Sequence, residues 1–160
     1  MTQQLGREQR QLVYYSYYME NMTATFRRNI FNFISFIQVV LGSAIMADIS
    51  SHFFAGLLMT LFSTYIFVYK PGEKASSAKK QARRYEKLIN ILDTINLNQL
   101  NDRLSDYIDQ DSDPIHLLTR PAYIKAAIAV GYSHEELEEE INNLTFSERI
   151  ASFIAGGIPC

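Results

Sequence analysis

Cysteine is almost missing from this sequence, because Cys160 is the only one among its 160 residues. A disulfide framework needs paired cysteines, so we do not expect a small secreted domain that is held together by such bonds. Tryptophan is missing altogether, and the net formal charge of −2 is too small to indicate a generally basic protein. Nucleic-acid binding is therefore not expected.

Motifs that carry catalysis are also missing. His134 and Glu135 begin like the zinc-protease motif His-Glu-x-x-His, but Glu138 stands where the second histidine belongs, so one metal ligand is lost. The sequence has no glycine-rich phosphate loop, and no general base lies beside Cys160. We therefore expect a protein that is not an enzyme and that has no cofactor and no metal site.

A partial calcium motif leads to the same expectation. Asp109, Asp111 and Asp113 have the spacing of the first ligands of an EF-hand loop. Pro114 replaces the glycine that this loop requires, and Arg120 stands where the bidentate glutamate belongs. Calcium binding at this place is not expected.

Charged side chains are missing from two long runs, residues 29–47 and 49–69, which Asp48 separates. A helix rises about 1.5 Å per residue, so roughly 20 residues cross a hydrocarbon core of about 30 Å. Both runs are apolar nearly all round, unlike the surface helix of a soluble protein. The sequence predicts a transmembrane hairpin with spans 29–47 and 52–69. The alternative is a soluble helical protein with a hydrophobic hairpin at its centre.

Basic residues flank the predicted hairpin on one side only. Arg27 and Arg28 precede the first span, residues 70–87 carry a dense group of lysines and arginines, and the connector has none. By the positive-inside rule, both termini are cytoplasmic in a multi-pass protein of the inner (plasma) membrane. The first run starts too late and is too long for a secretory signal.

The same basic residues are predicted to bind the headgroups of membrane lipid. A basic side chain near an anionic surface contributes about 1 kcal/mol of binding. The residues expected to make these contacts are Arg27, Arg28, Lys70, Lys74, Lys79 and Lys80.

The segments on either side of the hairpin are predicted to be helical, so the fold class is all-α. Residues 1–28 form a cytoplasmic N-terminal helix, and residues 70–160 form a cytoplasmic helical region with no strand pattern. The first segment carries four clustered rings, Tyr14, Tyr15, Tyr17 and Tyr18. Such rings suit a membrane interface, and they equally suit packing against the other cytoplasmic helices.

The region after the hairpin begins with a Pro-Gly break at residues 71–72. An apolar stripe then recurs at spacings of three and four, and it consists of Tyr85, Leu88, Leu92 and Ile95. Residues 97–108 continue the stripe, either on a second helix or on the same helix bent, and Pro114 ends that element. Three short helices follow, and two of them carry capping boxes, Ser133 with Glu136 and Thr145 with Glu148.

Polar and small residues follow one face of each predicted span. At 100° per residue they cover about 140° of the first span and about 120° of the second. On the first span they are Asn32, Ser35, Gln38, Gly42 and Ser43, and on the second they are His52, Gly56, Thr60, Ser63 and Thr64.

Two functions are compatible with these faces. Small and hydroxyl residues let helices approach closely, and we favour this helix-packing role for the second span. Asn32 and Gln38 place full amides in the hydrocarbon region, where a single hairpin offers few partners. Homo-oligomerisation or a water-filled lumen would satisfy them, so the first-span set is interpreted as pore-lining or helix-packing.

Four segments resemble the SLATT family, the two-helix membrane effector domains of bacterial nucleotide-signalling conflict systems. "FRRNIFNFISFIQVVLGSAIMA" is similar to the first span of that family with its basic flank, and "FFAGLLMTLFSTYIFVY" to the second. "EKASSAKKQARRYEKLINIL" resembles the helix that leaves the membrane, and "PAYIKAAIAVGY" a later cytoplasmic helix. Together these segments cover residues 20–132. The resemblance implies an oligomeric effector that opens a pore or disrupts the inner membrane when a sensor is triggered.

The chain departs from the usual setting of that family, since no nucleotide-sensing domain is fused to it. The sensor is then expected to be a separate protein. A first alternative function is a non-conducting adaptor that recruits a partner to the membrane through its cytoplasmic helices. A second is a phage protein of the holin or superinfection-exclusion type.

Overall fold

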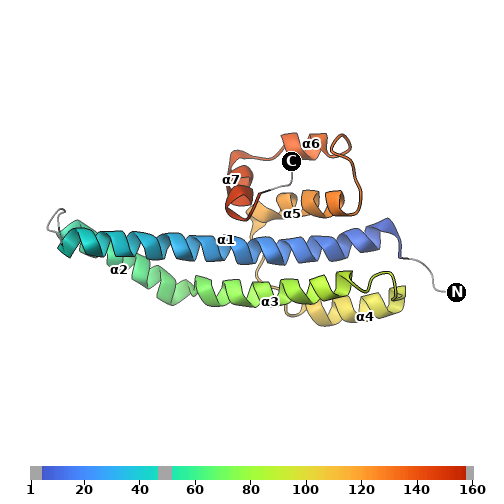
Figure 1. Cartoon of the computed structure of the whole chain (residues 1–160), viewed down its shortest axis with the longest axis horizontal. Helices are drawn as coiled ribbons and strands as arrows, with labels where there is room; N and C mark the ends of the chain where they lie inside the picture. Colours follow the sequence, from blue (N-terminus) through green and yellow to red (C-terminus); the bar gives the residue numbers. More distant parts are fainter. Residues whose placement is uncertain (1–4, 47–51, 158–160) are drawn as a thin grey trace.

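The computed structural model describes residues 5–46 and 52–157, and every regular element in these ranges is a helix (Figure 1). The predicted all-α class is therefore confirmed for this part of the chain. The predicted connector around Asp48, the last residue of the first span and Cys160 lie outside the described residues. The helices are α1 (Arg7–Met46), α2 (His52–Tyr69), α3 (Pro71–Ile89), α4 (Leu97–Ile108), α5 (His116–Ala129), α6 (Glu138–Asn142) and α7 (Phe146–Ile154).

The longest element, α1, is one unbroken helix of 40 residues. It continues through the boundary at residue 28, where the predicted N-terminal segment meets the first apolar run. No proline lies within α1, and its one glycine, Gly42, is near its end, so nothing in the sequence interrupts the hydrogen-bond ladder. At about 1.5 Å per residue the helix is about 60 Å long. One rod therefore joins the apolar hairpin to the rest of the molecule.

The chain returns along α1 through α2 and then bends at Lys70. Lys70 has a φ of 45°, in the left-handed region, and Pro71 is the first residue of α3. Proline suits a first helical position because its missing N–H group would have no helical partner there. The predicted Pro-Gly break is thus confirmed as a bend between two nearly consecutive helices.

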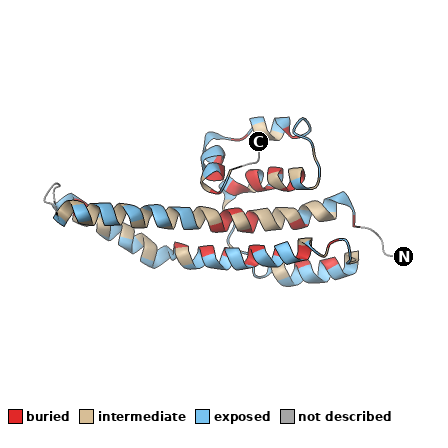
Figure 2. Ribbon diagram, in the orientation of Figure 1, coloured by how far each residue is buried: buried red, intermediate tan, exposed pale blue. Residues whose placement is uncertain are grey.

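Burial divides the molecule into two parts (Figure 2). The buried residues of α1 all lie between Val13 and Ala24, and within the described chain Ala55 is the one buried residue of α2. We call residues 30–46 with α2 the hairpin, and the remaining described helices the bundle. By length and composition, α1 and the segment from α2 into α3 are apolar enough to cross a membrane.

In the bundle, α3 packs lengthwise on α1. Its buried positions near the hairpin are small, Ala75, Ala78 and Ala82, and small side chains let the two helix axes approach closely. Further along, the predicted stripe is buried together with residues of α1 and α4, which confirms it. The first cluster consists of Leu5, Val13, Tyr85, Leu88, Leu92, Leu100 and Leu104, and Ile95 packs against it.

The stripe continues on a separate helix. Asn96 caps α4: its side chain accepts from the backbone N–H of Gln99, and the Gln99 side chain accepts from the backbone N–H of Asn96. The alternative of one bent helix is therefore wrong. This element ends at Ile108, before Pro114, as predicted.

The two predicted capping boxes both form, but they begin helices of different lengths. Thr145 and Glu148 cap α7. Ser133 and Glu136 exchange the same two hydrogen bonds, yet residues 134–137 are a turn, and only the five residues of α6 follow. The predicted helix from residue 134 is therefore too long by about one turn.

A C-terminal lobe of α5, α6 and α7 lies on the side of α1 opposite to α3 and α4 (Figure 1). The second cluster joins this lobe to α1 and consists of Met19, Met22, Leu118, Ala122, Ala151 and Ala155. The tyrosines of α1 are shared between the two sides, with Tyr14 and Tyr17 against the first cluster and Tyr15 and Tyr18 against the second. Of the two alternatives for these rings, packing against the bundle is the one found.

Candidate functional site

The structure brings together one predicted polar residue from each helix of the hairpin. The Nε2 of Gln38 donates a hydrogen bond of 2.8 Å to the hydroxyl of Ser63, and it lies 3.5 Å from the carbonyl oxygen of Met59. Gln38 is half-buried and Ser63 is exposed. A polar pair therefore lies on the surface of a mainly apolar hairpin.

Three other hydroxyl groups of the hairpin are satisfied within their own helices. Ser35, Ser43 and Thr60 each donate to the carbonyl four residues earlier, at 2.9 Å. This bond removes the cost of burying a free hydroxyl in an apolar medium, so these residues need no partner from another helix.

The two glycines of the predicted faces have different surroundings. A Cβ at Gly42 would lie 3.9 Å from Met59, whereas at Gly56 nothing comes within 4 Å. Gly42 therefore faces α2 in the hairpin, and Gly56 has open space beside it. For Gly56 and the exposed Thr64, a helix-packing role remains a prediction about contacts with another chain.

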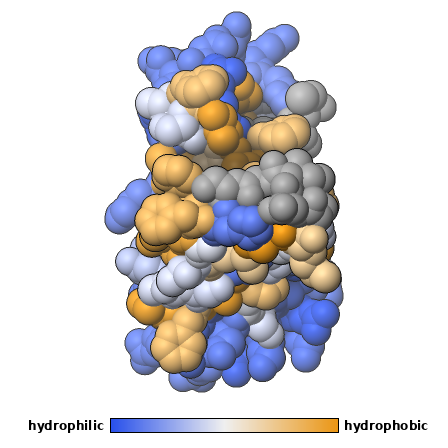
Figure 3. Space-filling view, turned by 90° about the vertical axis from the view of Figure 1, so that its left-hand side faces the viewer, coloured by the Kyte–Doolittle hydropathy of each residue, from blue (hydrophilic) through white to orange (hydrophobic). Residues whose placement is uncertain are grey.

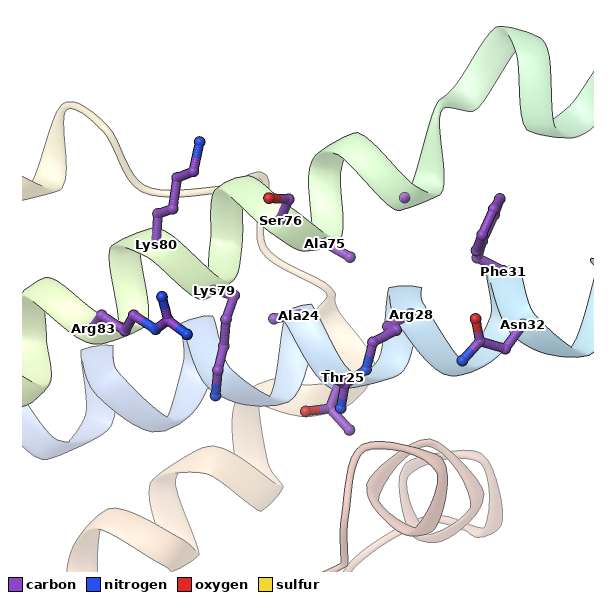
Figure 4. Close-up of a pocket in the computed structure, with 11 residues that line it drawn as sticks. Ala24, Thr25, Arg28, Phe31, Asn32, Ala75, Ser76, Lys79, Lys80 and Arg83 are labelled. Carbon is purple, nitrogen blue, oxygen red and sulfur yellow. The ribbon is translucent and has the colours of Figure 1, made fainter.

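A groove of about 410 Å³ runs between α1 and α3 where the hairpin meets the bundle (Figure 4). We call it the basic groove, because four cationic side chains line it, Arg28, Lys79, Lys80 and Arg83, and none of the described lining residues is acidic. The other lining residues are Ala24, Thr25, Phe31, Asn32, Gly72, Ala75 and Ser76.

Small residues keep the basic groove open on the α3 side. Gly72 and Ala75 line it, and a Cβ at Gly72 would meet the ring of Phe31 at 3.9 Å. The Nζ of Lys79 donates to the side-chain oxygen of Asn21 at 2.7 Å, which holds this lysine across the interface between α1 and α3. The polar amide of Asn32 lies at the hairpin end (Figure 4).

The predicted headgroup residues divide into two sets. Arg28, Lys79 and Lys80 line the basic groove. The other three contact the protein: Arg27 donates to the backbone oxygen of Asp113 at 3.0 Å, Lys74 lies 3.8 Å from the Asp113 carboxylate, and Lys70 lies 3.6 Å from that of Glu73. Exposed ion pairs of this kind contribute at most about 1 kcal/mol, so they can exchange for other anions.

Arg83 completes the basic groove; it belongs to the predicted basic group of residues 70–87 but was not one of the six residues named for headgroup contacts. It lies four residues after Lys79 on α3, so the two side chains share a helix face. Grouping the basic residues by helical position, rather than by distance from the span, would have included it. Several cations around one cavity, with hydroxyl and amide donors beside them, are suited to binding phosphate oxygens.

A partly buried polar network joins α1 and α3 to the segment that follows α4. The hydroxyl of Tyr85 donates to the carboxylate of Asp111 at 2.9 Å, and Gln81 donates to the same carboxylate at 2.8 Å. The carboxylate of Glu20 accepts from the backbone N–H of Ser112 at 2.8 Å, while its second oxygen is buried and has no partner among the described residues. These bonds hold residues 111–112 against the bundle.

Burial shifts the proton equilibria of this network. It raises the pKa of Glu20, and the hydrogen bonds from Ser112 lower it in part. Burial also raises the pKa of Asp111, opposed by the bonds from Gln81 and Tyr85. The pKa of Tyr85 is raised by burial and by the negative charge of Asp111. The network was not predicted, because the pattern around Asp111 gives no sign that this carboxylate accepts hydrogen bonds from Gln81 and Tyr85.

In the described ranges, no group of three or more histidine, cysteine, aspartate or glutamate side chains is placed to hold a metal ion. No protein-family model, curated protein or solved structure matches this chain. The resemblance to the SLATT family therefore rests on the four quoted segments alone and remains a prediction.

Proposed function

We propose that this protein is an oligomeric effector of the inner membrane that opens a pore when it is triggered. The observation that carries the proposal is the Gln38–Ser63 pair, a polar group on the surface of the apolar hairpin. Two features support it, the exposure of the hairpin and the position of this pair along it.

The hairpin exposes large apolar side chains along both of its helices. Phe36, Phe53 and Phe67 are 64%, 73% and 80% exposed, respectively. Soluble monomers rarely expose apolar surface over such a length, because its contact with water is unfavourable. A lipid bilayer removes this cost and gives the hairpin its function as a membrane anchor.

Gln38 lies at the middle of the apolar part of α1, nine residues after Asn29 and eight before Met46. At about 1.5 Å per residue this is about 13 Å from either end, and therefore near the centre of a bilayer. The bond to Ser63 satisfies one N–H of the amide, but the amide oxygen accepts no hydrogen bond from the described ranges. Lipid offers it no donor, whereas another copy of the chain or a water-filled lumen does.

Homo-oligomerisation follows from the size of the hairpin, because two helices cannot enclose a lumen by themselves. Several copies with their Gln38–Ser63 pairs directed inward would form a polar constriction. The bundle would carry the trigger, and a separate sensor protein is the proposed source of the signal. The basic groove would hold the base of each hairpin at anionic lipid headgroups.

An adaptor that does not conduct is the second candidate. The observation that favours it is the acidic surface of the C-terminal lobe, where Glu135, Glu136, Glu138 and Glu139 are all exposed. Such a surface can recruit a basic partner to the membrane by electrostatic attraction.

Induced expression in a bacterial host separates the two candidates. A pore-forming effector should depolarise the inner membrane, and Gln38→Leu should weaken the effect because it makes the constriction apolar. Phe54→Leu is the control, because Phe54 is apolar, is 66% exposed and lies on the side of α2 opposite to Ser63. If triggered cells keep their membrane potential while the protein is in the membrane, the pore proposal is wrong and the adaptor remains.

A further inference from the structure

The last helix, α7, exposes an apolar stripe. Phe146, Ile150 and Phe153 are 79%, 44% and 82% exposed, and their spacings of four and three place them on one side of the helix. The opposite side is already used, because Ala151 and Ala155 belong to the second cluster. The stripe is therefore not part of the core of the lobe.

The position of α7 relates this stripe to the hairpin. The side-chain N–H of Asn29 donates to the carbonyl oxygen of Ile154 at 2.7 Å. Asn29 is the residue at which the uncharged run of α1 begins, next to Arg27 and Arg28. Figure 1 shows α7 at the end of the lobe nearest the hairpin, with α5 running away from it.

One exposed side of the lobe faces the same way as the tip of the hairpin. Figure 3 shows the molecule from the tip of the hairpin, and apolar side chains gather in this view on the lobe above the hairpin as well as on the hairpin itself. A single apolar medium can therefore contact the hairpin and the lobe together.

We propose that α7 is an interfacial helix, which lies on the cytoplasmic face of the membrane and inserts its apolar stripe at the boundary between headgroups and acyl chains. The inference rests on the membrane embedding of the hairpin. The arrangement has the features of such helices, an apolar side bordered by polar residues, here Ser147 and Arg149. A second attachment then fixes the C-terminal lobe on the bilayer beside the place where α1 leaves it.

Lipid is the occupant that continuity favours. The bond between Asn29 and Ile154 holds one end of α7 at the level where α1 leaves the proposed bilayer, so the bilayer surface meets this helix without any rearrangement. If a second copy of the chain covered the stripe of α7, that copy would need a complementary apolar face. The hairpin would then contact lipid while α7 contacted protein, so two neighbouring apolar surfaces would need two different partners. Lipid fits both surfaces at once.

The absence of tryptophan from the sequence makes the test direct, because one introduced indole is the only one in the protein. Three single variants of the full chain are reconstituted into vesicles, and the indole fluorescence is compared between ordinary and brominated lipid, since bromine quenches an indole that it touches. Phe153→Trp reports on α7. Phe36→Trp reports on the hairpin, and Leu12→Trp is the control on a bundle position that is 50% exposed.

In brominated lipid, Phe153→Trp should lose roughly half of its emission or more, and bromine near the headgroup should quench it better than bromine near the chain end. Phe36→Trp should show the opposite preference for depth, and Leu12→Trp should not be quenched. Quenching of Phe36→Trp without quenching of Phe153→Trp overturns the interfacial role of α7 and leaves the hairpin intact. If Phe36→Trp is not quenched either, the membrane embedding itself is wrong.

Discussion

Glu20 offers the sharpest test of the bundle, because this acidic residue is only 4% exposed. One oxygen accepts from the backbone N–H of Ser112, and the other is buried without a partner among the described residues. A buried polar atom without a partner costs about 1 to 3 kcal/mol. Replacing Glu20 by Gln keeps the accepting oxygen and puts an N–H group where the unpartnered oxygen was. The negative charge of Asp111 disfavours the charged form of Glu20, whereas it attracts the N–H group of a glutamine at this position.

The sign of the pH dependence follows from the direction of the pKa shift. Burial raises the pKa of Glu20 in the folded protein above its ordinary value of 4.5. The carboxyl therefore contributes its full stability below about pH 4.5, and this contribution is lost as the pH rises through the folded pKa. Glu20→Gln removes this loss. At pH 4 the variant and the wild type should unfold at similar temperatures, and at pH 7 the variant should be more stable by about 1 to 2 kcal/mol.

The assay is thermal unfolding in detergent, followed by far-UV circular dichroism at both pH values. For a chain of this size, 1 kcal/mol corresponds to about 2 to 4 °C in Tm. Glu139→Gln on α6 is the matched control, because its carboxylate is exposed, and it should change neither temperature. If Glu20→Gln is less stable at pH 7 than the wild type, the buried carboxylate is charged and stabilising, and the reasoning is wrong.

Three further predictions concern the bundle and the basic groove. Tyr85→Phe removes the donor to Asp111 and should cost about 1.5 to 3 kcal/mol in chemical unfolding; an unchanged midpoint would mean that the bond contributes nothing. Leu92→Asp places a charge in the first cluster, where Leu92 is 3% exposed, and should cost several kcal/mol, so proteolysis should degrade the bundle while the hairpin stays protected in the membrane. Arg83→Gln should weaken retention on vesicles of anionic lipid relative to neutral lipid, whereas Lys87→Gln, outside the groove, should do so less.

The sequence predicted the helices well where one physical signal dominated. The uncharged runs, the stripe through Tyr85 and Leu92, and the capping box at Thr145 each correspond to an observed element. These signals are local: periodicity and capping depend on residues within a few turns of one another.

The predictions were weakest where a distant segment decides the outcome. The sequence of a single hairpin indicates few partners for Gln38, yet Ser63 lies beside it, because the register between two helices cannot be read from either one alone. The basic residues shared one predicted role, but the segment around Asp113 returns to the hairpin and contacts Arg27 and Lys74. The exposed stripe of α7 was likewise invisible, since periodicity identifies an apolar face but not whether the fold covers it.

Electrical recording from planar bilayers that contain the purified protein tests the proposed function most directly. The wild type should produce a conductance across the bilayer, and Gln38→Leu should reduce it, since an apolar constriction loses water more easily. Insertion is checked in the same preparations by protection of the hairpin from protease. A protein that is inserted but silent under every trigger tested, or a Gln38→Leu variant that conducts as well as the wild type, would contradict a pore lined at its centre by the Gln38–Ser63 pair.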